Sequence, residues 1–318
     1  MSNPFSSIAL KWRLANRAQS EVRWSWLSCV LLNPRVAGIL ALCMSFGSIL
    51  PSEVWAQSQK EYQLIWSDEF EGEGKPDTTF WSFERGFVRN EELQWYQDEN
   101  ASLENGLLVI NGKREDFPNP NYDAQSSNWR RSREKIEYSS SCLYSKGKVE
   151  FQYGVLEVRA KIDTAMGMWP AIWTLGIDQP WPACGEVDLM EYYLVGGRPT
   201  ILANACWSAG ENYKSHWDSE SVPLKELTVG NDKWSSQFHI WKMDWTQDYI
   251  KLYLDDQLLN EIDLSTTTNP DGFNPFRQPH YILLNLALGS NGGDPSGTHF
   301  PRTYEIDYVR LYQQSTTR

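Results

Sequence analysis

Residues 156–162 read Leu-Glu-Val-Arg-Ala-Lys-Ile, so apolar and charged side chains alternate along this stretch. The four apolar residues share one face of an extended chain, and the three charged residues share the other. A period of two is typical of a strand with one buried face. The same alternation recurs at Ile250, Leu252 and Leu254, and the turn-forming residues 255–257 that follow predict a hairpin.

Other segments extend this pattern into an all-β fold. The run from Tyr281 to Leu288 is nearly all apolar and predicts a strand that is covered on both faces. Loop-forming residues 118–121 and 289–294 separate the strands, and no segment after residue 56 keeps a strong helical spacing. We therefore expect an antiparallel β-sandwich of two sheets, without a linker or internal repeat.

The first 56 residues predict an export leader instead of part of the fold. Five basic residues precede an apolar run, 36–50, of about 15 residues, fewer than the ~20 that a spanning helix needs. Val54-Trp55-Ala56 is a cleavage signal, so the mature domain is expected over residues 57–318. We therefore expect secretion to the extracellular space or the periplasm. The alternative is that the leader stays uncleaved and anchors the protein to the membrane.

The charge balance narrows the choice of partners. The chain has 29 Lys and Arg against 41 Asp and Glu, a net charge of −12, and losing the basic leader makes the rest more acidic. Such a surface repels phosphate backbones and anionic lipid. We expect an uncharged ligand, no nucleic acid, no membrane once the leader is cleaved, and a monomer.

The cysteines and histidines suggest no metal or redox chemistry. Cys142, Cys184 and Cys206 follow the leader, and their odd number and irregular spacing favour buried free thiols. A Cys184–Cys206 bridge is the alternative. The four histidines lack ligand spacing, and the chain has no His-Glu-x-x-His, no Gly-x-Ser-x-Gly and no valid phosphate loop.

Residues 185–193, Gly-Glu-Val-Asp-Leu-Met-Glu-Tyr-Tyr, hold three carboxylates within six positions. On a regular strand Glu186 and Asp188 point to one face and Glu191 points to the other. A β-bulge at Leu189-Met190 would absorb one extra residue and return Glu191 to the face of the other two. We expect one residue of this bulge to face the core.

Three like charges on one strand face repel one another, so their crowding suggests a function. Two carboxyl groups about 5 Å apart can cleave a glycosidic bond with retention of configuration, because one attacks the anomeric carbon while the other protonates the leaving oxygen. Asp188 between them would keep Glu186 ionised and help Glu191 alternate between acid and base. A solvated acidic strand is the alternative interpretation.

Tryptophans near this strand favour a sugar groove. Trp169 and Trp173 lie in the segment 166–173, and Trp181 follows shortly before the carboxylates. Indole rings stack on the apolar faces of pyranose rings, so tryptophans beside paired carboxylates fit a sugar site. Trp173 has apolar neighbours on both sides and is the one best suited to the core.

These residues together resemble glycoside hydrolase family 16, in particular its laminarinase-like branch with a bulged Glu-x-Asp-x-x-Glu strand. The resemblance covers most of residues 57–318. It runs in order through residues 64–70, 90–96, 146–148 with 154–161, 169–173, 186–191 and 306–312.

The resemblance implies a concanavalin-like jelly roll with a concave cleft and internal, retaining cleavage of β-1,3- or mixed β-1,3/1,4-glucan. Glu186 looks like the nucleophile, Asp188 its assisting carboxylate and Glu191 the acid/base. The residues that match cleft positions are Asn90, Glu92, Trp169, Trp173 and Trp181. Catalysis would need no cofactor. A structural calcium would be bound by the Asp307 side chain and the backbone oxygens of Glu69 and Gly106.

The chain also departs from the family pattern. Laminarinases often carry a histidine where residues 203–207 read Ala-Asn-Ala-Cys-Trp. Agarases, carrageenases and galactan-cleaving enzymes share the catalytic signature, so other polysaccharides stay open, as do transglycosylation and a non-catalytic glycan-binding module. The acidic charge argues against sulfated substrates, although several arginines keep them open: Arg85, Arg89, Arg130, Arg131 and Arg133.

Overall fold

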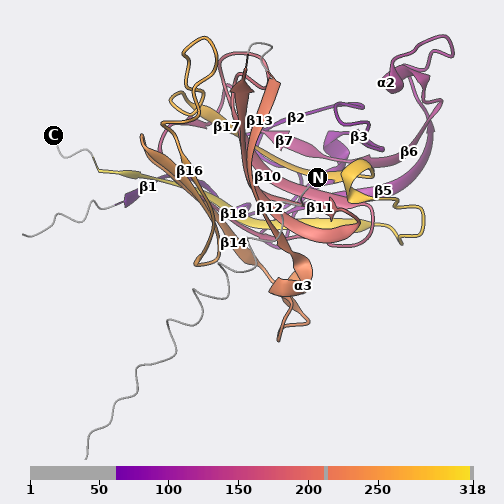
Figure 1. Ribbon diagram of the computed structural model, residues 1–318. Coiled ribbons are helices and arrows are strands. Elements are labelled where there is room, and N and C mark those ends of the chain that lie inside the picture. Colours follow the sequence, from indigo (N-terminus) through magenta and orange to yellow (C-terminus); the bar gives the residue numbers. More distant parts are fainter. Residues whose placement is uncertain (1–61, 211–213, 316–318) are drawn as a thin grey trace, which may run out of the picture. The chain divides into compact units, whose positions relative to one another are not determined.

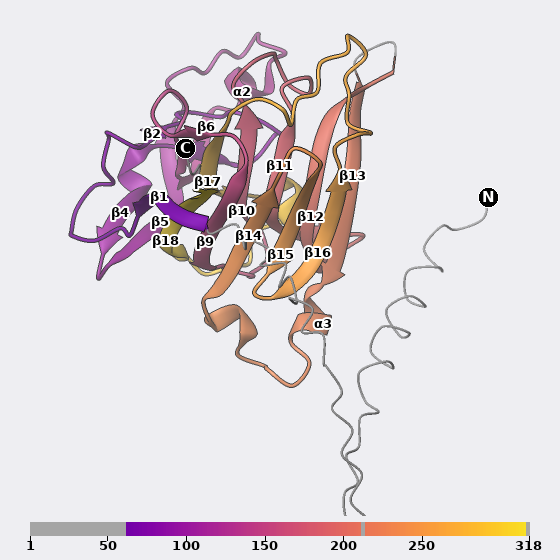
Figure 2. The same ribbon diagram turned by 90° about the vertical axis from the view of Figure 1, so that its left-hand side faces the viewer.

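The computed structural model describes residues 62–210 and 214–315, and these residues form two β-sheets that pack face to face (Figures 1 and 2). Neighbouring strands are antiparallel except for one parallel pair, β3 with β6. The predicted all-β sandwich is confirmed. The predicted leader, residues 1–56, lies outside the described residues.

The first sheet has ten strands. In spatial order they are β16 (Gln257–Asp263), β15 (Tyr249–Leu254), β14 (His239–Trp245), β9 (Gly154–Lys161), β18 (Arg302–Gln314), β5 (Leu107–Pro118), β6 (Lys135–Ser140) and β3 (Gln94–Tyr96), with β1 (Tyr62–Asp68) paired to β18 and β4 (Ala101–Glu104) paired to β5.

The second sheet has eight strands and carries the carboxylates. Its order is β13 (Lys214–Pro223), β12 (Arg198–Ala209), β11 (Glu186–Val195), β10 (Met168–Gly176), β17 (His280–Leu288), β7 (Cys142–Tyr144) and β2 (Ser82–Phe83), with β8 (Glu150–Phe151) paired to β17.

Helices in the described residues are single turns. They are α2 (Trp129–Ser132) and α3 (Leu224–Leu227), and the 3₁₀ turns η2 (Asp98–Asn100), η3 (Trp234–Ser236) and η4 (Ser290–Gly292). Within residues 62–210 and 214–315, no helix has the length and apolar character needed to cross a bilayer.

The predicted strand periodicities are confirmed. In β9 every second residue is buried, and the charged residues between them are half-buried. The hairpin forms between β15 and β16, with Asp255-Asp256 as its turn. β17 is buried along almost its whole length, because its Ile282 and Leu284 face the core between the sheets while Leu283 belongs to a second apolar cluster.

That second cluster lies on the outer face of the second sheet. It contains Tyr96 from β3 and Val88 from the preceding loop, together with Ala171, Trp173 and Leu283 from the sheet itself. The segment that runs from residue 85 to β3 therefore covers the β17 side of this face. Cys142, Cys184 and Cys206 are all buried free thiols, as predicted.

Candidate active site

A cleft of about 770 Å³ lies on the outer face of the second sheet. Strands β10, β11 and β12 form its floor, and the segment after residue 88 borders it on one side. Its lining residues are Arg89, Asn90, Glu92, Trp169, Ala171, Trp173, Leu175, Trp181, Glu186, Glu191, Tyr193, Asn204, Trp217, Ser219, Asn285, Ser290 and Asn291. The five predicted substrate-binding residues and both predicted catalytic glutamates thus meet in one cleft.

The predicted β-bulge is present in β11. Asp188 pairs with Asn204 of β12, and the next paired residues are Glu191 and Leu202, so three steps on β11 match two on β12. The pairing of β11 with β10 shifts at the same place. The extra residue turns Glu191 toward the cleft that Glu186 also lines.

The bulge buries more of the chain than expected. Leu189 and Met190 are both fully buried in the main core, where we expected only one of them. Val187 lies in the same core. The irregular part of β11 is therefore anchored by apolar packing against the first sheet, and this packing fixes the direction of the carboxylates on the other face.

Two tryptophans donate hydrogen bonds to the two glutamates. The indole Nε1 of Trp181 lies 2.6 Å from Oε2 of Glu186. The indole Nε1 of Trp169 lies 3.0 Å from Oε1 of Glu191. These indoles therefore hold the carboxyl groups in place in addition to offering apolar surface to a ligand.

Asn204 of β12 connects the carboxyl groups of Asp188 and Glu191. Its side-chain Nδ2 donates to Oδ2 of Asp188 at 3.2 Å and to Oε2 of Glu191 at 3.0 Å. One amide thus orients both acids. Asn204 lies in the segment where the sequence departs from the laminarinase pattern, and it occupies the position opposite Asp188.

Burial raises the pKa of all three acids of β11, because the charged forms lose solvation. It raises the pKa of Glu191 to about 8, aided by the charge of Glu186 and opposed by the hydrogen bonds from Trp169 and Asn204. A pKa raised in this direction suits a general acid, which must carry its proton near neutral pH.

Asp188 is fully buried, and burial together with the charges of Glu191 and Glu186 raises its pKa well above the usual range. Burial also raises the pKa of Glu186, but hydrogen bonds from Trp181 and Asp188 oppose this increase. The hydrogen bond between Asp188 and Glu186 raises the pKa of Asp188 and lowers the pKa of Glu186. This arrangement favours the ionised form of Glu186 relative to that of Asp188.

A buried polar network underlies the cleft. Glu92 accepts hydrogen bonds from Asn90 at 3.1 Å and from Gln94 at 2.6 Å. On the neighbouring strands, Asn285 accepts from the Trp173 indole at 2.7 Å and donates to the Tyr96 hydroxyl at 3.1 Å. Trp173 therefore belongs to the cleft-side cluster and not to the main core that its apolar neighbours suggested.

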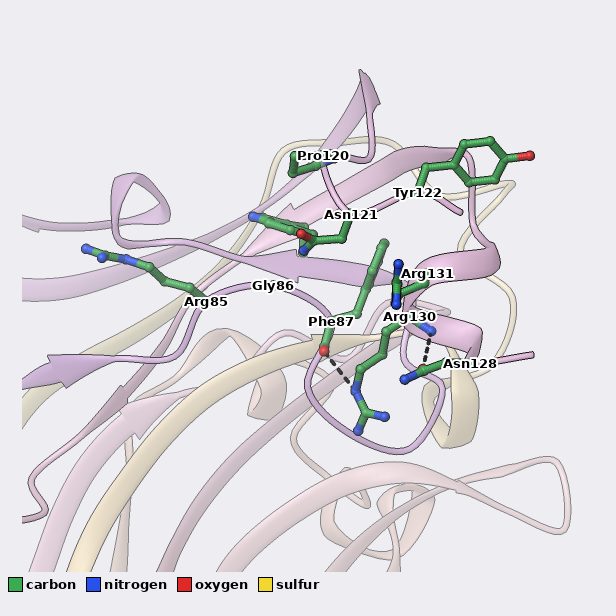
Figure 3. A pocket seen from close by; sticks show the side chains of 10 residues that line it. Arg85, Gly86, Phe87, Pro120, Asn121, Tyr122, Asn128, Arg130 and Arg131 are labelled. Atoms are coloured by element: carbon green, nitrogen blue, oxygen red, sulfur yellow. Dashed lines mark hydrogen bonds between the residues drawn. The ribbon is translucent and has the colours of Figure 1, made fainter. Parts of the chain in front are cut away.

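The arginines that suggested a sulfated substrate as an alternative do not gather in the cleft. Arg89 is the one arginine among the cleft-lining residues, and it is ion-paired with Glu84. Arg85, Arg130 and Arg131 instead line a separate pocket of about 470 Å³ (Figure 3). In this pocket Arg85 extends away from the other two, and Arg130 donates to the carbonyl of Phe87 at 3.1 Å.

The predicted calcium ligands lie in or directly beside strands of the first sheet. The pairing of β18 is irregular at Asp307. Just before it, Ile306 pairs with Leu108 near the start of β5. Just after it, Val309 pairs with Asp68 at the end of β1. Glu69 follows β1 and Gly106 precedes β5, so the register places both beside Asp307. The Asp307 carboxylate also forms an ion pair with Arg159. One carboxylate and two carbonyls are oxygen donors that suit calcium.

The sequence analysis did not predict several of the cleft residues. Asn204, Tyr193, Asn285 and Trp217 all line the cleft. Each comes from a strand whose neighbours are not evident from local sequence. Alternation in β12 offered a signal for Asn204, because Ala203 and Ala205 face the core while Asn204 between them lines the cleft.

Comparison with known proteins identifies the family. The sequence profile of glycosyl hydrolases family 16 matches residues 89–310. A beta-glucanase of Rhodothermus marinus is 31% identical over 79% of this chain and 85% of its own length. The chain belongs to glycosyl hydrolases family 16. Two longer relatives are also similar, and the chain spans 38% of the length of each.

Solved structures agree with this assignment. An endo-acting O-glycanase that initiates mucin breakdown, from the human gut microbiota, has 35% identity and a TM-score of 0.71, covering 80% of this chain and 91% of its own. The catalytic domain of an endo-1,3-beta-glucanase (laminarinase) from Thermotoga petrophila has 32% identity and a TM-score of 0.64, covering 80% and 99%.

The raised pKa of Asp188 predicts a pH-dependent stability. Its folded pKa lies well above its ordinary value of 3.8, so the wild type loses stability as pH rises through that value toward the folded pKa. Asp188→Asn removes this loss. The free energy of unfolding of the variant, measured by urea denaturation, should therefore rise relative to that of wild type as the pH is raised from 4 to 7.

Asp77→Asn is the control, because the backbone hydrogen bond from Thr79 lowers the pKa of Asp77 below its ordinary value of 3.8. The stability of this variant relative to wild type should stay nearly constant from pH 5 to pH 7, since both the folded and the unfolded pKa of Asp77 lie below that interval. A difference between Asp188→Asn and wild type that stays constant from pH 4 to pH 7 would contradict the raised pKa of Asp188.

Proposed function

We propose that this chain is a secreted, retaining endo-β-glucanase that hydrolyses β-1,3- or mixed β-1,3/1,4-glucan. The observation that carries the proposal is the bulge of β11, which brings Glu186 and Glu191 to one cleft lined with tryptophans. The beta-glucanase and laminarinase relatives support the substrate class.

In the first step the Glu186 carboxylate attacks the anomeric carbon, and the bond to the leaving oxygen breaks as Glu191 donates its proton to that oxygen. The second step reverses these roles. The Glu191 carboxylate takes a proton from water, the water oxygen attacks the anomeric carbon, and the ester bond to Glu186 breaks. Asp188 supports both steps through its hydrogen bond to Glu186.

The charge of the cleft favours a neutral substrate. Three acidic residues line it, Glu92, Glu186 and Glu191, and its arginine is paired with Glu84. A polyanion would find no unpaired cationic side chain among these lining residues. Carrageenan, which is sulfated, is therefore a weaker candidate than an uncharged glucan. Charge does not separate glucan from agarose or β-galactan, and the O-glycanase relative keeps other glycans in view.

Glu186→Gln should lower the release of reducing ends from laminarin by roughly 10⁴-fold, because the amide cannot form the covalent intermediate. The matched control is Glu261→Gln, which changes an exposed glutamate paired with Lys251. Circular dichroism should show an unchanged fold in both variants. A fully active Glu186→Gln enzyme would refute the assignment.

The same reaction mixtures separate the competing functions. Proton NMR of the first products should show the β-anomer, and products longer than the substrate, formed with an added acceptor, would indicate transglycosylation. Binding of laminarin without any cleavage by wild type would favour a glycan-binding module. Parallel reactions with lichenan, agarose and a galactan would reveal another substrate.

The calcium site is a second part of the proposal. Calcium at about a hundred times its Kd should raise the Tm by roughly 5–10 °C, because the ion binds only the folded state. Asp307→Asn should abolish this response in differential scanning calorimetry. Glu69→Gln is the control, since its side chain binds Arg310 and only its backbone oxygen is a proposed ligand. Equal responses in both variants would exclude this site.

Secretion is proposed from the leader, which lies outside the described residues. Protein exported by a bacterial host should begin at Gln57 in N-terminal sequencing, because cleavage is expected after Val54-Trp55-Ala56. An intact N-terminus in the membrane fraction would indicate a retained anchor instead.

A further inference from the structure

Two exposed tryptophans lie in the cleft. Trp181 and Trp217 are 53% and 42% exposed, and every other tryptophan of residues 62–210 and 214–315 is buried or half-buried. Trp181 donates its indole hydrogen bond to Glu186. The Trp217 side chain has no ring contact or hydrogen bond within the described residues, so its exposure has no explanation in the fold.

The register of three strands fixes the position of Trp217 relative to the proposed nucleophile. Glu186 of β11 pairs with Cys206 of β12, and Cys206 pairs with Trp217 of β13. Directly paired residues point to the same face of a sheet. Trp217 therefore faces the cleft two strands from Glu186, at a distance of ~10 Å from strand to strand.

This position is at the open side of the cleft. Strand β13 is the edge of the second sheet, whereas the β17 side is covered by the cluster that contains Tyr96 and Val88. Most side chains of β13 are polar and exposed. Trp217 with the neighbouring Ser219 thus offers one apolar ring and one hydroxyl at the end of the groove.

We propose that Trp217 is the stacking platform of a distal sugar subsite, which selects for long glucan chains. A ~10 Å separation exceeds the reach of a single pyranose ring bound at Glu186, so Trp217 contacts a more distant unit of the same chain. Its ring stacks on the apolar face of that unit. The inference rests on the proposed glucanase function and adds to it a preference for substrate length.

The experiment compares laminaribiose with laminarihexaose in isothermal titration calorimetry. Both proteins carry Glu186→Gln to prevent turnover, with and without Trp217→Ala. The Trp217→Ala change should weaken hexaose binding about tenfold, equivalent to ~1.4 kcal/mol, and leave biose binding unchanged. Trp217→Phe should recover part of the hexaose affinity, because a smaller ring still stacks.

The matched control is Tyr122→Ala, which removes an aromatic side chain that is 44% exposed outside the cleft. It should change neither affinity. In the active enzyme, Trp217→Ala should raise the KM for hexaose and leave kcat unchanged.

Equal weakening for both oligosaccharides, no weakening for either, or no hexaose binding by the parent protein would each overturn the subsite. These outcomes are independent of whether Glu186→Gln is inactive, which tests the proposed function by itself.

Discussion

One extra residue in β11 allows a single strand to satisfy two opposing demands. Its apolar side chains, Val187, Leu189 and Met190, pack into the core against the first sheet. Its acids must all face the opposite direction, and a strict alternation would send Glu191 into that core. The bulge resolves this conflict, and the cleft, the hydrogen bonds from the tryptophans and the proposed chemistry all depend on it.

The three acids can lie close together because their different surroundings give their carboxyl groups different proton affinities. Burial favours protonation of all three groups, but Trp181 and Asp188 donate to Glu186, whereas Asp188 and Glu191 share a single amide donor from Asn204. The groups therefore differ in proton affinity despite their common strand. Their different surroundings give chemically identical side chains separate parts in one reaction.

The sequence predicted features that depend on neighbours along the chain. A period-two pattern located β9, a nearly continuous apolar run located β17, and the parity of Glu186, Asp188 and Glu191 located the bulge. Features that depend on register across strands were missed. Asn204 and Trp217 are close to Asp188 and Glu186 only through strand pairing, which no local pattern specifies. The role of Trp173 was obscured as well, because its neighbour Ile172 faces the main core while Trp173 itself faces the cleft.

Strand β13 is attached to the sheet by its backbone, with its side chains mostly in solvent. Replacement of those side chains costs the core little, because they contribute almost nothing to its packing. The groove can therefore be remodelled at its margin while the reacting groups stay fixed. A directed-evolution library confined to Ser215, Trp217, Ser219 and Ser221 would explore new glycan preferences on an undisturbed catalytic scaffold.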